Sequence, residues 1–156
     1  MEGFDLIITH IMGGIGNQLF QYALGRCLAL KSNTELKLDI GKNTSKSSHH
    51  SYYRLDYFNI QQNFATEEDL KRVADKDDEN FNPELNLRRV EDTAPRAYVP
   101  ELFDSPDNIY IKGYWQREEY FMAIANILRK ELTPKYLLEK NSSAWKEKIL
   151  SAECAV

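Results

Sequence analysis

The feature that most constrains this chain is an apolar segment, LIITHIM at residues 6–12, that leads directly into the glycine-rich turn GGIG at residues 13–16. The apolar segment, rich in β-branched residues, is typical of a buried strand. From Asn17 to about Lys31 apolar residues recur every three to four positions, which predicts a helix. The alternating segment ELKLDI at residues 35–40 predicts a second strand. A strand, a glycine turn, a helix and a strand form a βαβ unit, which requires a parallel sheet.

Composition narrows the class of protein. The 156 residues are 42% hydrophobic and 28% charged, which suits one globular domain. The net charge of −4, without a block of Lys or Arg, argues against a nucleic-acid partner. Cys27 and Cys154 make no disulfide framework, and no apolar run is long enough for a transmembrane segment or a signal peptide. We therefore expect a cytoplasmic protein in which Cys27 is a buried thiol.

The middle of the chain gives weaker signals. Residues 41–54 are polar and predict a loop. Thr66, with Asp69 three positions later, predicts a capped helix that runs to about Ala74. Residues 75–108 contain an acidic run, four prolines and little periodicity, so we expect an irregular segment with at most short strands.

The last third repeats the step from strand to helix. NIYIKGYW at residues 108–115 predicts a strand, and residues 116–132 predict one helix. A further helix is expected after Pro134, and AECAV at the end of the sequence resembles the start of another buried strand. The apolar face expected for the helix at 116–132 consists of Phe121, Ile124, Ala125, Leu128 and Leu132.

The glycine turn allows two interpretations. Gly13, Gly14 and Gly16 could shape a tight connection, or they could let the backbone approach an anion at a helix N-terminus. No Walker A pattern is present, and the third glycine of a dinucleotide fingerprint would fall at Leu19. Asp39, at the end of the second strand, lies near the position of a ribose-binding acid, but this match alone is weak.

Amide side chains favour the ligand interpretation. Asn17, Gln18 and Gln21 lie in the first turns of an otherwise apolar helix. Capping explains Asn17, but it does not require two glutamines as well.

Three stretches also resemble a known family. GGIGNQLFQYALGRCLAL (13–30), YRLDYFNI (53–60) and IYIKGYWQREEYF (109–121) resemble, in the same order, segments of the family 11 glycosyltransferases, the α-1,2-fucosyltransferases. The resemblance implies transfer of fucose from GDP-fucose to the 2-hydroxyl of a galactose-containing glycan, with inversion and without a required metal or other cofactor. It also implies an α/β fold, a Rossmann-like parallel sheet flanked by helices, as the N-terminal half of a GT-B glycosyltransferase.

The family's second domain holds the donor diphosphate with an H-x-R-R-x-D segment, which this sequence lacks. By resemblance, residues 1–140 form the N-terminal, acceptor-side domain, and residues 141–156 form a connecting helix and the start of the donor-binding domain. The missing domain would complete the site. We therefore expect very low or no transferase activity from these 156 residues alone.

The resemblance also assigns roles to residues. Asn17 is the candidate catalytic residue, because its amide would contact the sugar or the diphosphate. The candidate substrate-binding residues are Gly14, Ile15, Gly16, Gln18, Gln21, Trp115 and Gln116. Trp115 could equally be a core residue, and Tyr114 is expected to pack.

No general base is assigned, although an inverting transfer needs a proton acceptor. His49, His50, Asp39 and Glu118 remain open, and the two histidines, in a polar loop, are more often simply solvated. The helical aromatic residues are expected in the core, namely Phe20, Tyr22, Tyr120 and Phe121.

One function of another class stays open, and a further one is disfavoured. The chain could be a nucleotide- or sugar-binding module without catalysis, which tight GDP binding by the chain alone would favour. A dehydrogenase-like Rossmann domain is disfavoured, because the third glycine of its fingerprint is absent.

Overall fold

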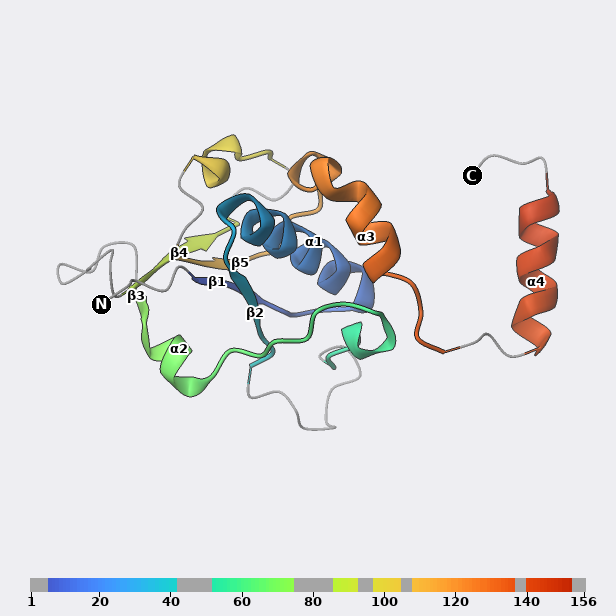
Figure 1. Cartoon of the computed structure of the whole chain (residues 1–156), viewed down its shortest axis with the longest axis horizontal. Coiled ribbons are helices and arrows are strands. Elements are labelled where there is room, and N and C mark those ends of the chain that lie inside the picture. The colour runs from blue at the N-terminus through green and yellow to red at the C-terminus, as the bar shows by residue number, and fades with distance from the viewer. Residues whose placement is uncertain are drawn as a thin grey trace.

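The computed structural model contains one parallel sheet, with its strands in the order β2-β1-β5-β4-β3 (Figure 1). It describes residues 6–41, 52–74, 86–92, 97–104, 108–136 and 140–152. The strands are β1 (Leu6–His10), β2 (Glu35–Asp39), β3 (Val73–Ala74), β4 (Leu87–Glu91) and β5 (Ile109–Lys112). The expected α/β, Rossmann-like fold is confirmed. Because every pair is parallel, the carboxyl ends of the strands meet at one edge of the sheet.

Helices connect and cover these strands. The α-helices are α1 (Ile15–Ser32), α2 (Glu67–Lys71), α3 (Ala125–Glu131) and α4 (Lys140–Ser151), with 3-10 turns η1 (Leu55–Tyr57), η2 (Pro100–Phe103), η3 (Glu118–Tyr120) and η4 (Met122–Ile124). Helices α1 and α3 lie side by side, and both line one apolar groove of about 440 Å³ (Figure 1). Across the described ranges, no helix is both long and apolar enough to cross a membrane.

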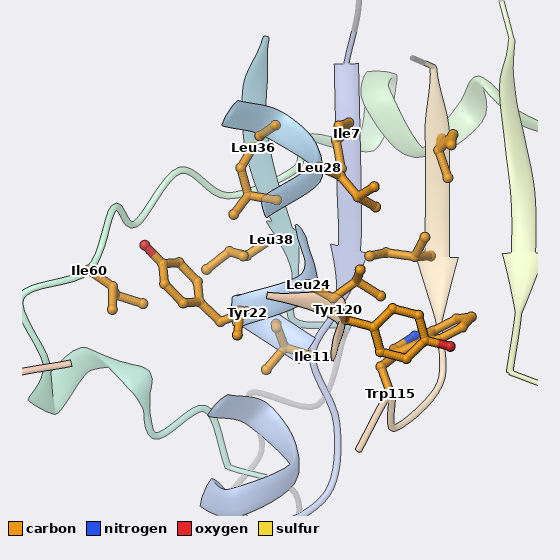
Figure 2. Packing of buried hydrophobic residues seen from close by; sticks show 14 of the residues in the cluster. Ile7, Ile11, Tyr22, Leu24, Leu28, Leu36, Leu38, Ile60, Trp115 and Tyr120 are labelled. Carbon is orange, nitrogen blue, oxygen red and sulfur yellow. The ribbon is translucent and has the colours of Figure 1, made fainter. Parts of the chain in front are cut away.

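The main core lies between α1 and one face of the sheet. Figure 2 shows side chains from α1 directed toward side chains of β1 and β2, among them Tyr22, Leu24, Leu28, Ile7, Leu36 and Leu38. Cys27 is buried at 6% exposure, as expected. Two of the expected core aromatics, Tyr22 and Tyr120, are fully buried, whereas Phe20 and Phe121 are half-buried and pair at 5.8 Å beside the groove.

The second face of the sheet carries a smaller core and more charge. Leu6, Ile8, Leu87 and Tyr110 form its buried cluster, with Leu70 of α2 packed against them. Lys37 of β2 forms an ion pair of 2.9 Å with Asp69 of α2, which ties that helix to this face.

Helix boundaries differ from the sequence expectations in two places. α1 begins at Ile15, two residues before Asn17, and its N-cap is Gly14. Thr66 and Asp69 form the expected capping box, but α2 ends at Lys71, and Val73–Ala74 pairs with β4. The pairing strand, Leu87–Glu91, lies within the segment expected to be irregular. Backbone pairing with a neighbouring strand therefore overrides weak local periodicity there.

The prediction of one continuous helix over residues 116–132 is wrong, because the 3-10 turns η3 and η4 precede the seven-residue α3. Tyr120 explains part of the break: its ring is 1% exposed, and its hydroxyl bonds the backbone of Val99 and Ala97. The expected apolar face still packs on the core, with Leu128 buried and Phe121, Ile124 and Leu132 against it. The expected helix after Pro134 is present as α4, whereas residues 153–156, expected to start a strand, lie outside the described residues.

We predict that Gly25→Ala destabilises the fold, although alanine is the better helix former. A Cβ at Gly25 would lie 2.1 Å from Oγ1 of Thr9 and 2.8 Å from Cδ1 of Leu36, so α1 would have to move away from β1. The expected loss in the free energy of unfolding is about 1–3 kcal/mol in urea denaturation. The matched control is Gly16→Ala, because a Cβ there meets nothing within 4 Å. Equal stabilities of the two variants would show that α1 does not approach β1 and β2 as closely at Gly25 as the structure indicates.

Candidate functional site

The glycine loop connects β1 to α1 at the carboxyl edge of the sheet, and its glycines differ in what the fold requires of them. Gly13 has φ +74°, and a Cβ there would lie 2.8 Å from Nδ2 of Asn17, so backbone and space both demand glycine. Gly14 has an ordinary φ of −72°. A Cβ at Gly14 or at Gly16 would meet nothing within 4 Å. The fold therefore explains Gly13 but leaves Gly14 and Gly16 unexplained.

The N-terminus of α1 is open to solvent. Gly14, Ile15 and Gly16 are exposed, and the first bond of the helix runs from Gln18 N–H to Gly14 C=O at 3.1 Å. The N–H groups of Ile15, Gly16 and Asn17 therefore precede the intrahelical ladder. No side chain caps this end, and no acidic residue lies in its first turn. Such an end attracts an anion, because unpaired N–H groups and the helix dipole both favour negative charge there.

Gln18 is 1% exposed and joins the loop to the segment that follows the polar stretch. Its Nε2 donates to the carbonyls of Gly13 and Tyr52, at 2.8 and 2.7 Å, and its Oε1 accepts from Arg54 N–H at 2.8 Å. The side chain thus holds the start of α1 against residues 52–54.

Gln21 is 0% exposed and makes the corresponding link to the loop after β5. Its Oε1 accepts from Met12 N–H at 3.0 Å, and its Nε2 donates to the carbonyl of Gly113 at 2.8 Å. The amides of Gln18 and Gln21 are thus bonded inside the protein, whereas the sequence predicts that they contact substrate. Substrate contact by these two amides stays a prediction, and the bonds indicate a supporting position for both residues.

Asn17 and Gln116 form a second link between the same two loops, at the surface. Nε2 of Gln116 donates to Oδ1 of Asn17 at 2.7 Å, although the residues are 99 positions apart. Gln116 is exposed and Asn17 is half-buried. The structure therefore brings two of the predicted site residues together beside the open helix end, where their amides can contact a ligand.

The aromatic residues after β5 differ in burial: Trp115 takes the core position that the sequence left open for it, and Tyr114 lies at the surface. Trp115 is 3% exposed and packs edge-on against Tyr120 at 5.8 Å, so its faces lie in the core (Figure 2). The expectation that Tyr114 packs in the core is wrong, because Tyr114 is 41% exposed. The cause is the backbone: Gly113 has φ +154° and Trp115 has φ +52°, which ends the alternation of β5. The indole Nε1 of Trp115 is buried, and no described group bonds it.

A hydrogen-bonded trio lies at the same edge, on the second face of the sheet. Oδ2 of Asp39 accepts from the hydroxyl of Tyr110 at 2.7 Å and lies 2.9 Å from Nδ1 of His10, while Oδ1 accepts from Gly41 N–H at 2.8 Å. Burial alone would raise the pKa of Asp39, but the hydrogen bonds from His10, Tyr110 and Gly41 outweigh it, and the pKa lies below its usual range. Burial and the bond to Asp39 raise the pKa of Tyr110.

Sequence reasoning missed His10, although a signal was present. Along β1, the residues directed to the second face are Leu6, Ile8 and His10, and the first two are buried. A histidine in the third place of an apolar series, at the last residue of a strand, is the position where a polar group reaches the carboxyl edge. Its partner could not be identified from sequence, because Asp39 becomes its neighbour only through the parallel register of β1 and β2.

The remaining candidate bases gain little from the structure. Glu118 is exposed, and His49 and His50 lie outside the described residues. Within the ranges that are described, no three His, Cys, Asp or Glu side chains gather closely enough to hold a metal ion.

Comparison with known proteins gives one informative match. The chain is 27% identical to an alpha-1,2-colitosyltransferase of Escherichia coli, over 83% of this chain and 46% of that protein. The chain thus spans about half the length of this relative, which is a glycosyltransferase. No protein-family model matches the chain. No solved structure matches it either.

We predict that Gln21→Met destabilises the protein strongly, because it removes the partners of the half-buried Met12 N–H and of the buried Gly113 carbonyl. Each unpaired group costs about 1–3 kcal/mol in the free energy of unfolding, measured by urea denaturation. Hydrogen exchange at the Met12 amide should also accelerate. The control, Gln116→Met, changes an exposed side chain and should stay within about 0.5 kcal/mol of the wild type. Similar losses of stability in both variants would show that the two hydrogen bonds of Gln21 stabilise the protein no more than an exposed amide does.

We further predict that Asp39 makes the protein sensitive to acid. A carboxyl whose pKa is lowered by folding stabilises the native state above its unfolded pKa, about 3.9, and this stabilisation is lost as the pH falls through the native pKa. The difference in unfolding free energy between the wild type and Asp39→Asn should therefore shrink below about pH 4. Urea denaturation between pH 3 and pH 6 measures it. A constant difference across that range would show that Asp39 is not held in its ionised form.

Proposed function

We propose that the protein is a sugar-nucleotide-dependent glycosyltransferase whose glycine loop forms one wall of the donor site. Specifically, we propose that it transfers fucose, with inversion, from GDP-fucose to a galactose 2-hydroxyl of a glycan, as the resemblance to α-1,2-fucosyltransferases implies. Similarity to the E. coli colitosyltransferase supports the reaction class.

One observation carries the donor site: Gly14 and Gly16 are glycines that the fold does not require. Neither has a φ in the left-handed region, and a Cβ on either would enter open space. Glycine inside a helix costs up to about 1 kcal/mol relative to alanine, so Gly16 lowers stability without a return in packing. Close approach of a ligand to the backbone accounts for both. The uncapped N–H groups beside them suit the diphosphate of a sugar nucleotide.

The amide pair Asn17 and Gln116 suits the sugar that such a donor carries. Amides offer donors and acceptors without charge, which matches hydroxyl groups. Their mutual bond of 2.7 Å orients both side chains next to the helix end. We assign Asn17 the direct contact with the sugar or the diphosphate, and Gln116 a supporting contact.

The identity of the sugar has a specific alternative. Colitose is fucose without its 3-hydroxyl, and the matched relative is named for colitosyl transfer. Colitosyl transfer is therefore the second candidate reaction at the same site. A binding module without catalysis is the alternative of another class.

The test is a titration of the isotope-labelled chain with GDP-fucose, followed by amide NMR. We expect the amide resonances of Ile15, Gly16 and Asn17 to shift, and Gly16→Ala to raise the dissociation constant about tenfold or more, which corresponds to at least about 1.4 kcal/mol. The added methyl group occupies the space that the phosphate needs. The stability of Gly16→Ala should be equal to that of the wild type or higher.

Asn126→Ala, at an exposed position of α3, is the control and should bind like the wild type. GDP-colitose in a parallel titration separates the two candidate sugars by affinity. Tight binding of GDP alone, with no added effect of the sugar, would favour the binding module. Resonance shifts confined to other parts of the chain would contradict the assignment of the loop.

A further inference from the structure

We propose that His10 is the catalytic base that takes the proton of the acceptor hydroxyl, and that Asp39 and Tyr110 are positioning residues that orient its ring. This inference rests on the glycosyltransferase function proposed above and deepens it. It starts from the hydrogen-bonded trio, which joins the ends of β1 and β2 to the middle of β5.

The bonding pattern determines which nitrogen of His10 is available. An ionised carboxylate only accepts hydrogen bonds, so Nδ1 of His10 must be the donor at 2.9 Å from Oδ2 of Asp39. In the neutral ring the proton then resides on Nδ1, and Nε2 carries the lone pair. No residue in the described part of the chain hydrogen-bonds Nε2. The ring is thus prepared to accept a proton there, in the way that a buried aspartate orients the histidine of a hydrolase triad.

Within the trio, the residue proposed to accept the proton is more exposed than the two residues that orient it. The side chain of Asp39 is 10% exposed and Tyr110 is buried, whereas the side chain of His10 is 22% exposed. The imidazole of His10 is therefore the part of the trio that is most exposed to solvent. Neighbouring side chains on this part of the second face are also partly open, including Lys112 at 38% and Glu91 at 45%. A polar ligand can reach this part of the face.

Asp39 itself is poorly suited to be the base, although it was one of the open candidates. Its two oxygens already take part in three short hydrogen bonds, at 2.7, 2.8 and 2.9 Å. Those bonds favour the ionised form and so weaken its attraction for a further proton. A carboxylate in this position instead stabilises the imidazolium that forms when His10 is protonated.

The location agrees with the proposed donor site. His10 is the last residue of β1 and precedes Gly13 by three positions. Ligands of open parallel sheets bind at the carboxyl ends of the strands. In the step we propose, the acceptor oxygen attacks the anomeric carbon while Nε2 takes its proton. The bond from that carbon to the diphosphate oxygen breaks, and the diphosphate leaves with the electron pair.

The experiment is histidine side-chain NMR on the ¹⁵N-histidine-labelled chain. The sequence has three histidines, and His10→Gln identifies the resonances of His10 by their loss. We expect the wild-type ring to be the Nδ1–H tautomer, and we expect Asp39→Asn to lose this preference. Methyl β-galactoside, added with GDP present, should shift the Nε2 resonance of His10 in a saturable way. A merely structural bond between the strands would fix the tautomer but would not respond to the galactoside.

Two results would overturn the inference while the proposed function stands: an Nε2–H tautomer, or a His10 ring unaffected by the galactoside although the loop amides respond to GDP-fucose. If neither GDP-fucose nor the galactoside shifts any resonance, the assignment of the glycine loop as a donor wall fails, and the assignment of His10 fails with it. Tyr110→Phe is the conservative comparison, since it removes one bond to Asp39 but leaves His10 and Asp39 in place. We expect it to retain the response to the galactoside with weaker tautomer preference.

Discussion

The arrangement of the carboxyl edge depends on two buried amides, those of Gln18 and Gln21. Loops that leave a parallel sheet lose the ladder that pairs their backbone groups, and buried N–H and C=O groups need other partners. A glutamine amide supplies a donor and an acceptor from one side chain. Gln21 uses both to join the loop after β1 to the loop after β5, and Gln18 joins α1 to residues 52–54. Three segments far apart in sequence are thereby held at one place.

Gln18 and Gln21 hold the loops in place from inside the protein, whereas other residues of the same loops remain exposed. Gln18 and Gln21 face inward, whereas Asn17, next to Gln18 and one turn before Gln21, bonds Gln116 at the surface. The glycines divide in the same way. Gly13 and Gly25 are required by backbone angle or by close packing, whereas Gly14 and Gly16 are bare without such a need. A glycine alone therefore does not indicate a ligand site, and our proposal rests on the two glycines that the fold does not require.

The sequence predicts the regular parts of this molecule well and the irregular parts poorly. The βαβ unit, the capping box at Thr66 and the apolar face that includes Leu128 all follow from periodicity and local chemistry. Periodicity fails where the backbone leaves its regular angles. The positive φ of Trp115 turns the indole inward and Tyr114 outward, and the 3-10 turns interrupt the helix expected at 116–132. Pairs that only strand register creates, such as His10 with Asp39, cannot be read from spacing along the chain.

The positions of His10 and the glycine loop relative to β1 give the two proposals a common geometric basis. The loop leads into α1, which packs on one face of the sheet, while His10 and Tyr110 belong to the second face. Inversion at a sugar carbon requires the entering hydroxyl and the departing phosphate to lie on opposite sides of that carbon. In the proposed site the phosphate would lie at the start of α1 and the base would approach from the second face, so a sugar held between the two would be attacked from the side opposite its phosphate. His10 is directed to the second face because side chains alternate along β1, whereas the loop that starts at Gly13 leads into α1 on the first face.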